Sequence, residues 1–375
     1  MRLIQVNLQP VFGGGEVYTG FLTRALAALG VKTTLVCHRR AEFWSRLGLP
    51  EGTELRPIGT WDELPAQLPA ARAWVLTHGP LPPAVQDIVA RDHRLTGIAH
   101  MPLAGRADRY DAYAMVFGVS ACVAEGLRAA GFSVWDEPLY GVADLRRGEA
   151  PGGGPLRQTS CYDWDRRKLR DRLLGALEPR VEPLRRRPAF ARQGALTLGI
   201  VSRLTPIKQF PRQFALLAPR LAHVPEVTLD IFGSGGYASV RDLKRALAPL
   251  GGRARFWGQQ RDVAAVYRQL DYLMTGLPEK EALGLNVIEA QACGTPVLAV
   301  QAPPFTETVI EGRTGFFYRD PREDDGADFA ALLARLRALP APLRPQLATE
   351  HLARFGLPAF TERLRRVVAW AGGQA

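Results

Sequence analysis

The chain has 375 residues, and 47% of them are hydrophobic. A single hydrophobic core stops growing at about 250 to 300 residues, so we expect two domains with a cleft between them. The longest purely apolar runs, such as Val297 to Val300, are too short to span a membrane, so we expect no transmembrane segment. The strand-like residues Arg2 to Val6 follow Met1 directly, so we expect no signal peptide. The formal net charge of +11 favours an anionic partner: a nucleotide, a nucleic acid, an acidic lipid surface or an anionic glycan.

In the first half of the chain, short apolar strands alternate with amphipathic helices, which is the pattern of parallel β-α-β units. The predicted strands cover residues 2–8, 33–38, 73–77, 95–100 and 115–119. The helix after the first strand ends at Gly30 and carries an apolar stripe formed by Val17, Phe21, Leu22, Ala25, Leu26 and Leu29.

The composition breaks at residues 141–155, where three consecutive glycines lie between prolines, and a strongly basic stretch from Arg166 to Arg192 follows. This stretch is either a solvated linker or a surface that binds a membrane or an acceptor. The four cysteines lack the close spacing of a zinc or redox site, so we expect buried thiols in a reducing cytoplasm; they are Cys37, Cys122, Cys161 and Cys293.

A second series of strands is predicted at residues 196–201, 227–232, 254–257, 272–275 and 296–300, followed by a helical tail from Asp328. We therefore predict an α/β protein with two facing Rossmann-like, doubly wound domains, which bind ligands at the carboxyl ends of their strands. The expected parts are a first domain at 1–155, a basic interdomain segment at 156–194, a second domain at 195–355, and a C-terminal helix at 356–375 that could cross back to the first domain.

Two glutamates at a spacing of eight, Glu281 and Glu289, give the strongest local signal. The first is expected in a loop and the second about two turns inside the following helix. Gly284 between them would let backbone N–H groups approach a phosphate at the positively polarised start of the helix. Carboxylates beside such a site can accept hydrogen bonds from sugar and ribose hydroxyls; the alternative is that both are solvated helix residues.

Two cations, Arg203 and Lys208, follow the predicted strand 196–201 and could neutralise a diphosphate at the mouth of that sheet. A glycine turn at residues 13–15 precedes Glu16 and opens the first helix, where a donor phosphate or an acceptor could approach the backbone. The turn lacks the full G-x-G-x-x-G spacing, so it does not indicate a dinucleotide site.

Taken together, these pieces resemble the retaining glycosyltransferases of family four, the glycosyl transferases group 1, which have the GT-B fold. The family's E-x7-E pattern appears as Glu281 and Glu289, and its G-R-L-x-x-x-K pattern appears, altered, as Ser202 through Lys208. Its amino-terminal glycine loop appears at residues 13–16, and the resemblance extends over about residues 1 to 320.

The resemblance implies a role for each matching residue. Arg203 and Lys208 would hold the donor diphosphate, Glu289 the ribose hydroxyls and Glu281 the transferred sugar. Further donor contacts would come from the backbone of Leu283, Gly284, Leu285 and Asn286, from Gly14 and Gly15, and from the stretch around Gly258, which would border the base.

His100, at the end of a first-domain strand, matches a family histidine that faces the sugar across the cleft; the alternative is an ordinary, satisfied histidine near a strand end. Some positions depart from the family pattern: Ala282 and Leu283 stand where Gly and Phe are usual, and Gln209 where Gly is usual. These changes leave the donor role intact but make the sugar harder to identify. Glu279 also lies close by, but the spacing to Glu289 favours Glu281.

The stretch from Asp163 to Asp165 has the D-x-D pattern of the metal site in the other major glycosyltransferase fold. Its position beside Arg166 favours a surface ion pair instead. We therefore expect no metal site and no cofactor besides the nucleotide-sugar co-substrate.

The resemblance implies metal-independent hexosyl transfer with retention, from a nucleotide-diphosphate sugar to a glycan or lipid-linked acceptor. Family habit suggests a role in cell-envelope polysaccharide or lipopolysaccharide synthesis, in the cytoplasm, either free or at the anionic inner face of the membrane. The alternatives are a GT-B nucleotide-sugar epimerase, a phosphorylase, and a non-catalytic nucleotide-binding or nucleic-acid-binding protein. Sparse aromatic residues in the basic interdomain segment at 156–194, chiefly Trp164 and Phe190, argue against nucleic acid.

Overall fold

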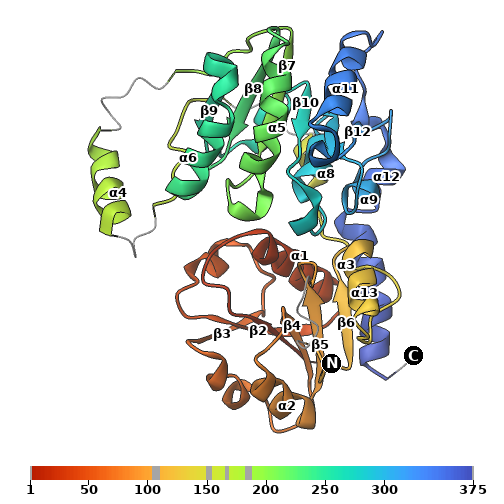
Figure 1. Cartoon of the computed structure of the whole chain (residues 1–375). Coiled ribbons are helices and arrows are strands. Elements are labelled where there is room, and N and C mark those ends of the chain that lie inside the picture. The colour runs from red at the N-terminus through yellow and green to blue at the C-terminus, as the bar shows by residue number, and fades with distance from the viewer. Residues whose placement is uncertain (1, 104–109, 149–153, 165–168, 182–187, 374–375) are drawn as a thin grey trace. The chain divides into compact units, whose positions relative to one another are not determined.

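The computed structural model describes residues 2–103, 110–148, 154–164, 169–181 and 188–373. The chain forms two compact units (Figure 1). The first contains residues 1–143 together with 353–375, and the second contains residues 144–352.

The first unit is built on a six-stranded sheet in which every neighbouring pair is parallel. Its central strands are buried on both faces, as expected for a sheet covered by helices; Leu3, Ile4 and Val36 have no exposed surface. In spatial order the strands are β3 (Glu54–Ile58), β2 (Lys32–His38), β1 (Arg2–Asn7), β4 (Trp74–His78), β5 (Arg94–Ala99) and β6 (Met115–Gly118).

The C-terminal helix belongs to this first unit and packs against α1 (Gly14–Ala28). The Phe360 ring of this helix, α13 (Leu357–Ala371), meets the Tyr18 ring of α1 edge to face, with ring centres 5.5 Å apart. Arg94 on β5 donates to the carbonyls of the last helical residues, and its guanidinium lies over the Trp370 ring. The other helices of the unit are α2 (Pro83–Asp92), α3 (Ala121–Ala129) and the short 3-10 helices η1 (Glu42–Arg46), η2 (Trp61–Glu63) and η3 (Pro65–Gln67).

The second unit contains a second six-stranded parallel sheet. In spatial order its strands are β12 (Gly315–Tyr318), β11 (Val297–Val300), β10 (Tyr272–Met274), β7 (Leu196–Val201), β8 (Val227–Phe232) and β9 (Ala254–Gly258). Its helices are α4 (Leu169–Val181), α5 (Phe210–Ala222), α6 (Tyr237–Ala246), α7 (Val263–Tyr267), α8 (Leu285–Ala292), α9 (Phe305–Thr308), α10 (Pro321–Asp324), α11 (Ala327–Arg337) and α12 (Thr349–Ala353), which ends at the boundary of the unit. Short 3-10 helices lie at η5 (Leu145–Gly148), η7 (Pro206–Lys208), η8 (Ala248–Arg253), η9 (Pro278–Lys280) and η10 (Pro345–Leu347).

Helices cover both faces of this second sheet. Because successive strand side chains point to opposite faces, Ile200 belongs to a core shared with α5, α6 and α11, while its neighbour Val201 belongs to a core shared with α7, α8 and α9. Burial on both faces explains why the strands read as continuous apolar runs.

Each sheet has one point where the strand order reverses. In the first unit the chain winds outward from β1 in one direction and from β4 in the other, and in the second unit the reversal lies between β7 and β10. In doubly wound sheets ligands bind outside the carboxyl ends of the strands at such a point. The expected α/β class with two doubly wound sheets is therefore confirmed.

Two edge strands were not predicted from the sequence. β3 carries exposed charged residues and Pro57, which are typical of an edge and hide the apolar pattern. β12 begins at Gly315, where a Cβ would lie 2.2 Å from the Val297 carbonyl oxygen. The apolar stripe predicted for α1 is only half correct, because Leu22, Ala25 and Leu26 are buried while Val17, Phe21 and Leu29 stay partly exposed.

The basic stretch contains α4, whose outward face carries four exposed leucines: Leu169, Leu173, Leu174 and Leu177. Of the basic residues in this stretch, only the side chains of Arg172, which is exposed, and Arg192, which pairs with Asp271, lie within the described part of the chain. None of the described helices combines the length and the apolar composition needed to cross a bilayer.

Candidate functional site

Lys208 and Glu281 form an ion pair in the second unit, although 73 positions separate them in the sequence. The ammonium of Lys208, the last residue of η7, donates to Oε2 of Glu281, which directly follows η9. The side chains are 25% and 15% exposed, so the pair is accessible but partly shielded from water. The structure thus brings together two of the residues predicted to hold a nucleotide sugar.

A glycine allows the two loops to approach each other. Gly276 follows β10, and a Cβ at this position would lie only 2.2 Å from the carbonyl oxygen of Lys208. Any side chain at Gly276 would therefore push the Lys208 loop away from the loop that carries Glu281. The close backbone contact places the ion pair at the carboxyl ends of β7 and β10, where the strand order reverses.

The start of α8 adds positively polarised backbone to this place. Gly284 is the N-cap residue, with a φ of 81° that favours glycine, and no side chain caps the helix. The first N–H groups of the helix, at Leu285 and Asn286, have no intrahelical acceptor. The Asn286 side chain donates to the carbonyl of Val201 at 3.1 Å, which ties the helix start to the end of β7. Leu283 is buried, at 3% exposure.

Arg203 lies in the loop directly after β7, two residues beyond the carbonyl that binds Asn286. Its side chain is exposed and has no hydrogen-bond or ion-pair partner within the described ranges. The loop itself is fixed, because the following amide of Leu204 donates to the carbonyl of Ser234 at 2.8 Å. A free guanidinium on a fixed loop can bind an anion without first breaking an ion pair.

Glu289 and Gly258 are placed differently from this group. Glu289 lies inside α8, and its Oε2 is 3.4 Å from the hydroxyl of Tyr267, which donates to it. Gly258 ends the edge strand β9, and the backbone of Thr159 and Ser160 packs against its Cα, so that a Cβ would lie 2.4 Å from the Ser160 carbonyl oxygen. Gly258 thus lies at the end of an edge strand, two strands away from β7 in the sheet.

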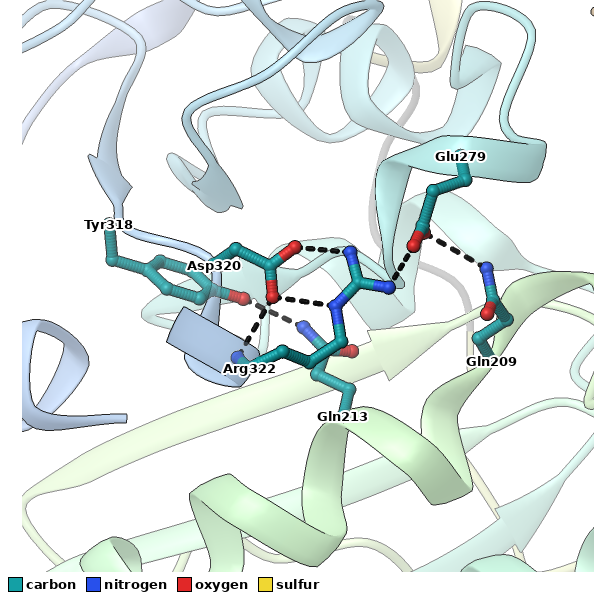
Figure 2. Close-up of polar contacts among 6 residues, drawn as sticks. All are labelled: Gln209, Gln213, Glu279, Tyr318, Asp320 and Arg322. Atoms are coloured by element: carbon teal, nitrogen blue, oxygen red, sulfur yellow. Dashed lines mark hydrogen bonds and ion pairs between the residues drawn. The ribbon is translucent and has the colours of Figure 1, made fainter. Parts of the chain in front are cut away.

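Glu279 contacts Arg322 and Gln209 (Figure 2). It is exposed, forms an ion pair with Arg322 and accepts from the side chain of Gln209 at 3.1 Å. Desolvation acts to raise the pKa of Glu279, but hydrogen bonds from the backbone, Arg322 and Gln209, together with the charge of Arg322, hold this pKa below its usual range. Arg322 also makes a two-pronged contact with Asp320, which caps α10. The two neighbouring glutamates therefore pair with different cations: Glu279 with Arg322 and Glu281 with Lys208.

Gln209 has the left-handed backbone conformation, with a φ of 55° and a ψ of 19°. This conformation explains why a glycine is usual at this position in the family that the sequence resembles. No sequence pattern predicted that Glu279 and its neighbours would pair with Gln209, Asp320 and Arg322; the available signal was the departure from glycine at position 209.

The first unit has a polar cluster at its own reversal point. His100 directly follows β5, and its Nε2 lies 3.0 Å from Nδ1 of His78, the last residue of β4. Burial, together with the charge of His100, holds the pKa of His78 well below its usual range. Burial alone lowers the pKa of His100 to about 4, so both rings are neutral at physiological pH. His78 was not identified from the sequence, although a histidine directly after the predicted strand 73–77 was a usable signal.

Gly14 and Gly15 open α1 in the same unit. The preceding Gly13 is the N-cap and no side chain caps the helix, so its first amides also lack intrahelical acceptors. A Cβ at either Gly14 or Gly15 would meet no atom within 4 Å, which leaves space beside the backbone.

The D-x-D pattern lies partly outside the described residues, which include Asp163 but not Asp165. Asp163 is exposed, and its amide donates to the carbonyl of Gly235 at 2.8 Å. Within the described ranges, no three or more His, Cys, Asp or Glu side chains converge in a way that could hold a metal ion.

Comparison with known proteins adds to these observations. Residues 195–338, which hold Arg203, Lys208 and α8, match the family model of the glycosyl transferases group 1. A D-inositol 3-phosphate glycosyltransferase of Stackebrandtia nassauensis is 34% identical over 178 residues, which are 43% of this chain and 38% of that protein. A protein of the same name from Streptomyces bingchenggensis is 27% identical over 92% of this chain and 82% of its own length.

Solved structures match over almost the whole chain. Anabaena Alr3699/HepE in complex with UDP-glucose has a TM-score of 0.69 at 16% identity, covering 98% of this chain and 99% of that chain. At this identity the likeness shows the fold. The chain therefore has the GT-B fold, with one of its two parallel sheets in each unit, and its residues 195–338 match the group 1 glycosyl transferases.

Proposed function

We propose that this protein is a retaining glycosyltransferase that moves a hexose-type sugar from a nucleotide-diphosphate sugar to a glycan or lipid-linked acceptor. The observation that carries the proposal is the Lys208–Glu281 pair beside the uncapped start of α8, where the strand order of the second sheet reverses. Arg203 adds a free cation at the same edge of the sheet. Cations and backbone N–H groups without an intrahelical acceptor can bind the negative charge of a diphosphate, and a carboxylate can accept hydrogen bonds from the hydroxyls of its sugar.

In this proposal the bond between the anomeric carbon and the diphosphate oxygen breaks as the acceptor oxygen bonds to the same face of the sugar. Arg203, Lys208 and the α8 amides stabilise the negative charge that grows on the leaving diphosphate. The acceptor's proton passes to the departing phosphate oxygen, so no dedicated protein base is required. Glu281 holds the transferred sugar, Glu289 holds the ribose, and His100 binds a hydroxyl of the sugar.

The charges already present in the protein favour metal independence, because two cations and a helix start can neutralise the leaving group. Addition of EDTA to the transfer reaction should therefore leave its rate unchanged. A rate that falls with EDTA and recovers with a divalent cation would refute metal independence while leaving the transferase proposal intact.

The donor can be identified by measuring the thermal stability of the purified protein against a panel of UDP-, GDP- and ADP-sugars, because a bound donor raises the melting temperature by mass action. Product analysis with the stabilising donor, with and without acceptor, then distinguishes the activities. Transfer requires the acceptor, whereas an epimerase would convert the donor alone. A non-catalytic nucleotide-binding protein would be stabilised without any turnover.

The acceptor in this proposal is anionic, in keeping with the net charge of +11. The name D-inositol 3-phosphate glycosyltransferase of two relatives favours a phosphorylated polyol as one candidate. A lipid-linked envelope precursor, as in lipopolysaccharide synthesis, is the second candidate. It is favoured by the exposed leucines of α4, such as Leu173 and Leu177, which could contact an anionic membrane surface from the cytoplasm.

The two acceptors can be separated by one comparison. Transfer to soluble inositol phosphate should be insensitive to vesicles, whereas transfer to a lipid-linked acceptor should rise with vesicles that contain anionic lipid. The variant Leu173→Ser with Leu177→Ser should lower only the vesicle-dependent rate. A control is Leu347→Ser, since Leu347 is more exposed, at 63%, than Leu173, at 57%, and Leu177, at 50%, but lies outside α4.

A further inference from the structure

A chain of hydrogen bonds in the first unit ends at His100 and determines which of its ring nitrogens carries the proton. The chain begins on α1, where the hydroxyl of Thr23 donates to the carbonyl of Thr19 at 2.7 Å. Because a hydroxyl has one hydrogen, Thr23 can only accept from its next partner. That partner is Gln5 on β1, whose amide lies 3.0 Å away, so the group facing Thr23 must be the NH2 of Gln5.

The orientation of the Gln5 amide fixes the tautomer of His78. With its nitrogen facing Thr23, Gln5 presents its carbonyl oxygen to Nε2 of His78 at 3.1 Å. A carbonyl oxygen only accepts, so His78 must carry its proton on Nε2. The neutral ring then has a lone pair on Nδ1.

The lone pair on His78 in turn fixes the tautomer of His100. Nε2 of His100 lies 3.0 Å from Nδ1 of His78, and two lone pairs facing each other at this distance would repel, so Nε2 of His100 must be the donor. The hydroxyl of Thr19 also lies 3.2 Å from the same Nδ1. Its hydrogen has a better acceptor in the carbonyl of Gly15 at 2.9 Å, and it accepts from Asn7 at 3.0 Å.

We propose that Gln5 and His78 are positioning residues that hold His100 as the Nε2–H tautomer, so that its Nδ1 offers a lone pair to a substrate hydroxyl. No described residue donates to this Nδ1. The ring is held in place by near-parallel stacking on His78, at 15°, and by the edge-on contact with Tyr18, at 87°. The proposal rests on the proposed function, which supplies the sugar, and it specifies how this histidine would recognise it.

The tautomer has a consequence for specificity. A neutral nitrogen with a lone pair accepts a hydrogen bond from a hydroxyl but repels a phosphate oxygen, which also only accepts. His100 would therefore select a hydroxyl of the substrate over a phosphate group. The two histidines would bind phosphate only if they were protonated, and burial opposes protonation of both.

The tautomer can be read directly by NMR on the full-length protein labelled with 15N, without any substrate. In the wild type at pH 7, the His100 ring should show a protonated Nε2 and an unprotonated Nδ1. His78→Phe removes the acceptor and should give a mixture of both tautomers. Gln5→Met acts one step earlier, with less change in size, and should show the same mixing if His78→Phe fails to fold. Thr96→Val, on the strand that directly precedes His100, is the matched control and should leave the tautomer unchanged.

Kinetics then separate positioning from a purely structural role. Gln5→Met and His78→Phe should lower kcat/KM for the donor about fivefold to tenfold, the effect of one weakened hydrogen bond, and should leave the Kd of the free nucleoside diphosphate unchanged. A wild-type His100 protonated on Nδ1, or an unmixed tautomer in both variants, would overturn the proposal. If the predicted tautomer is observed but no donor is turned over, the proposed function fails and the relay stands.

Discussion

The ammonium of Lys208 and the carboxylate of Glu281 neutralise each other at the carboxyl ends of the two central strands of the second sheet. A diphosphate that binds Lys208 must therefore compete with Glu281 for it. A sugar that binds Glu281 must compete with Lys208 in the same way. Binding a complete nucleotide sugar exchanges one internal ion pair for two ligand contacts, which limits the electrostatic cost of opening the pair.

This exchange predicts opposite effects for the two partners. Lys208→Ala should weaken nucleoside diphosphate binding about 10-fold to 100-fold, since a hydrogen bond to a charged group is worth about 1.5 to 3 kcal/mol. Glu281→Ala frees Lys208, so nucleotide affinity should hold or rise, while turnover should fall by at least about 100-fold because the sugar loses its carboxylate. Calorimetric titration with the nucleoside diphosphate and a transfer assay measure the two effects.

Glu279→Ala is the matched control for that experiment, because Glu279 pairs with Arg322 rather than with Lys208. Its removal should leave both affinity and turnover nearly unchanged. If Glu279→Ala abolished transfer and Glu281→Ala did not, the assignment of the functional acid would be reversed.

Gly284 should be intolerant of even one added carbon. Its φ of 81° strains any other residue, and an added Cβ would lie 3.2 Å from Cγ2 of Val287. Gly284→Ala should lower the free energy of unfolding by about 1 to 2 kcal/mol and, by shifting the start of α8, weaken nucleotide binding. Urea unfolding and the same titration report these two losses.

The control for Gly284→Ala is Gly252→Ala in the same unit, where a Cβ would meet no atom within 4 Å and φ does not lie in the left-handed region. This control should keep its stability and its affinity. Equal losses in both variants would mean that backbone conformation is not what makes position 284 special.

Much of the second sheet could be predicted from the sequence because its central strands are buried on both faces and read as unbroken apolar runs. The edge strands could not, since Pro57 and the charged residues of β3 carry no apolar signal. The elements of the donor site were predictable as separate motifs. The contact between Lys208 and Glu281 was not, because it depends on β7 and β10 becoming neighbours across a long sequence separation.

The polar cluster of the first unit shows the same limit. His100 was found through a family resemblance, which says nothing about its neighbours. Gln5 and His78 lie on β1 and β4, and only the reversal of strand order between these two strands brings them together. A pattern in one segment cannot report a hydrogen bond that depends on the pairing of two others.

Gln209 offers a test in which glycine should stabilise the protein. Outside the left-handed region, Gly is less stable than Ala by about 0.4 to 1 kcal/mol because it gains more freedom in the unfolded chain. At Gln209, with a φ of 55°, the Cβ of Ala is strained, so Gln209→Gly should unfold at higher urea than Gln209→Ala, by about 1 kcal/mol. Both variants lose the same hydrogen bond to Glu279, so the difference isolates the backbone. The ordinary order, with Ala more stable, would show that Gln209 is not left-handed in solution.

The buried histidines predict how stability depends on pH. The folded pKa of His100 is about 4 and that of His78 is also lowered, whereas an unfolded histidine titrates near about 6.5. Below pH 6.5 the unfolded chain binds protons that the folded chain does not, so stability is complete above about pH 7 and falls as the pH drops toward 4.

The expected loss is about 2 kcal/mol of unfolding free energy for His100 between pH 6.5 and pH 5, a window in which most carboxylates stay ionised. His100→Asn, which cannot take up this proton, should show a shallower decline than the wild type when unfolding by urea is followed across the window. His223→Asn is the control, since His223 is exposed and its removal should leave the slope unchanged. If the His100→Asn variant lost stability as steeply as the wild type, the His100 ring would be protonated in the folded protein at little cost. His100 would then not be neutral, and its proposed Nε2–H tautomer would be contradicted.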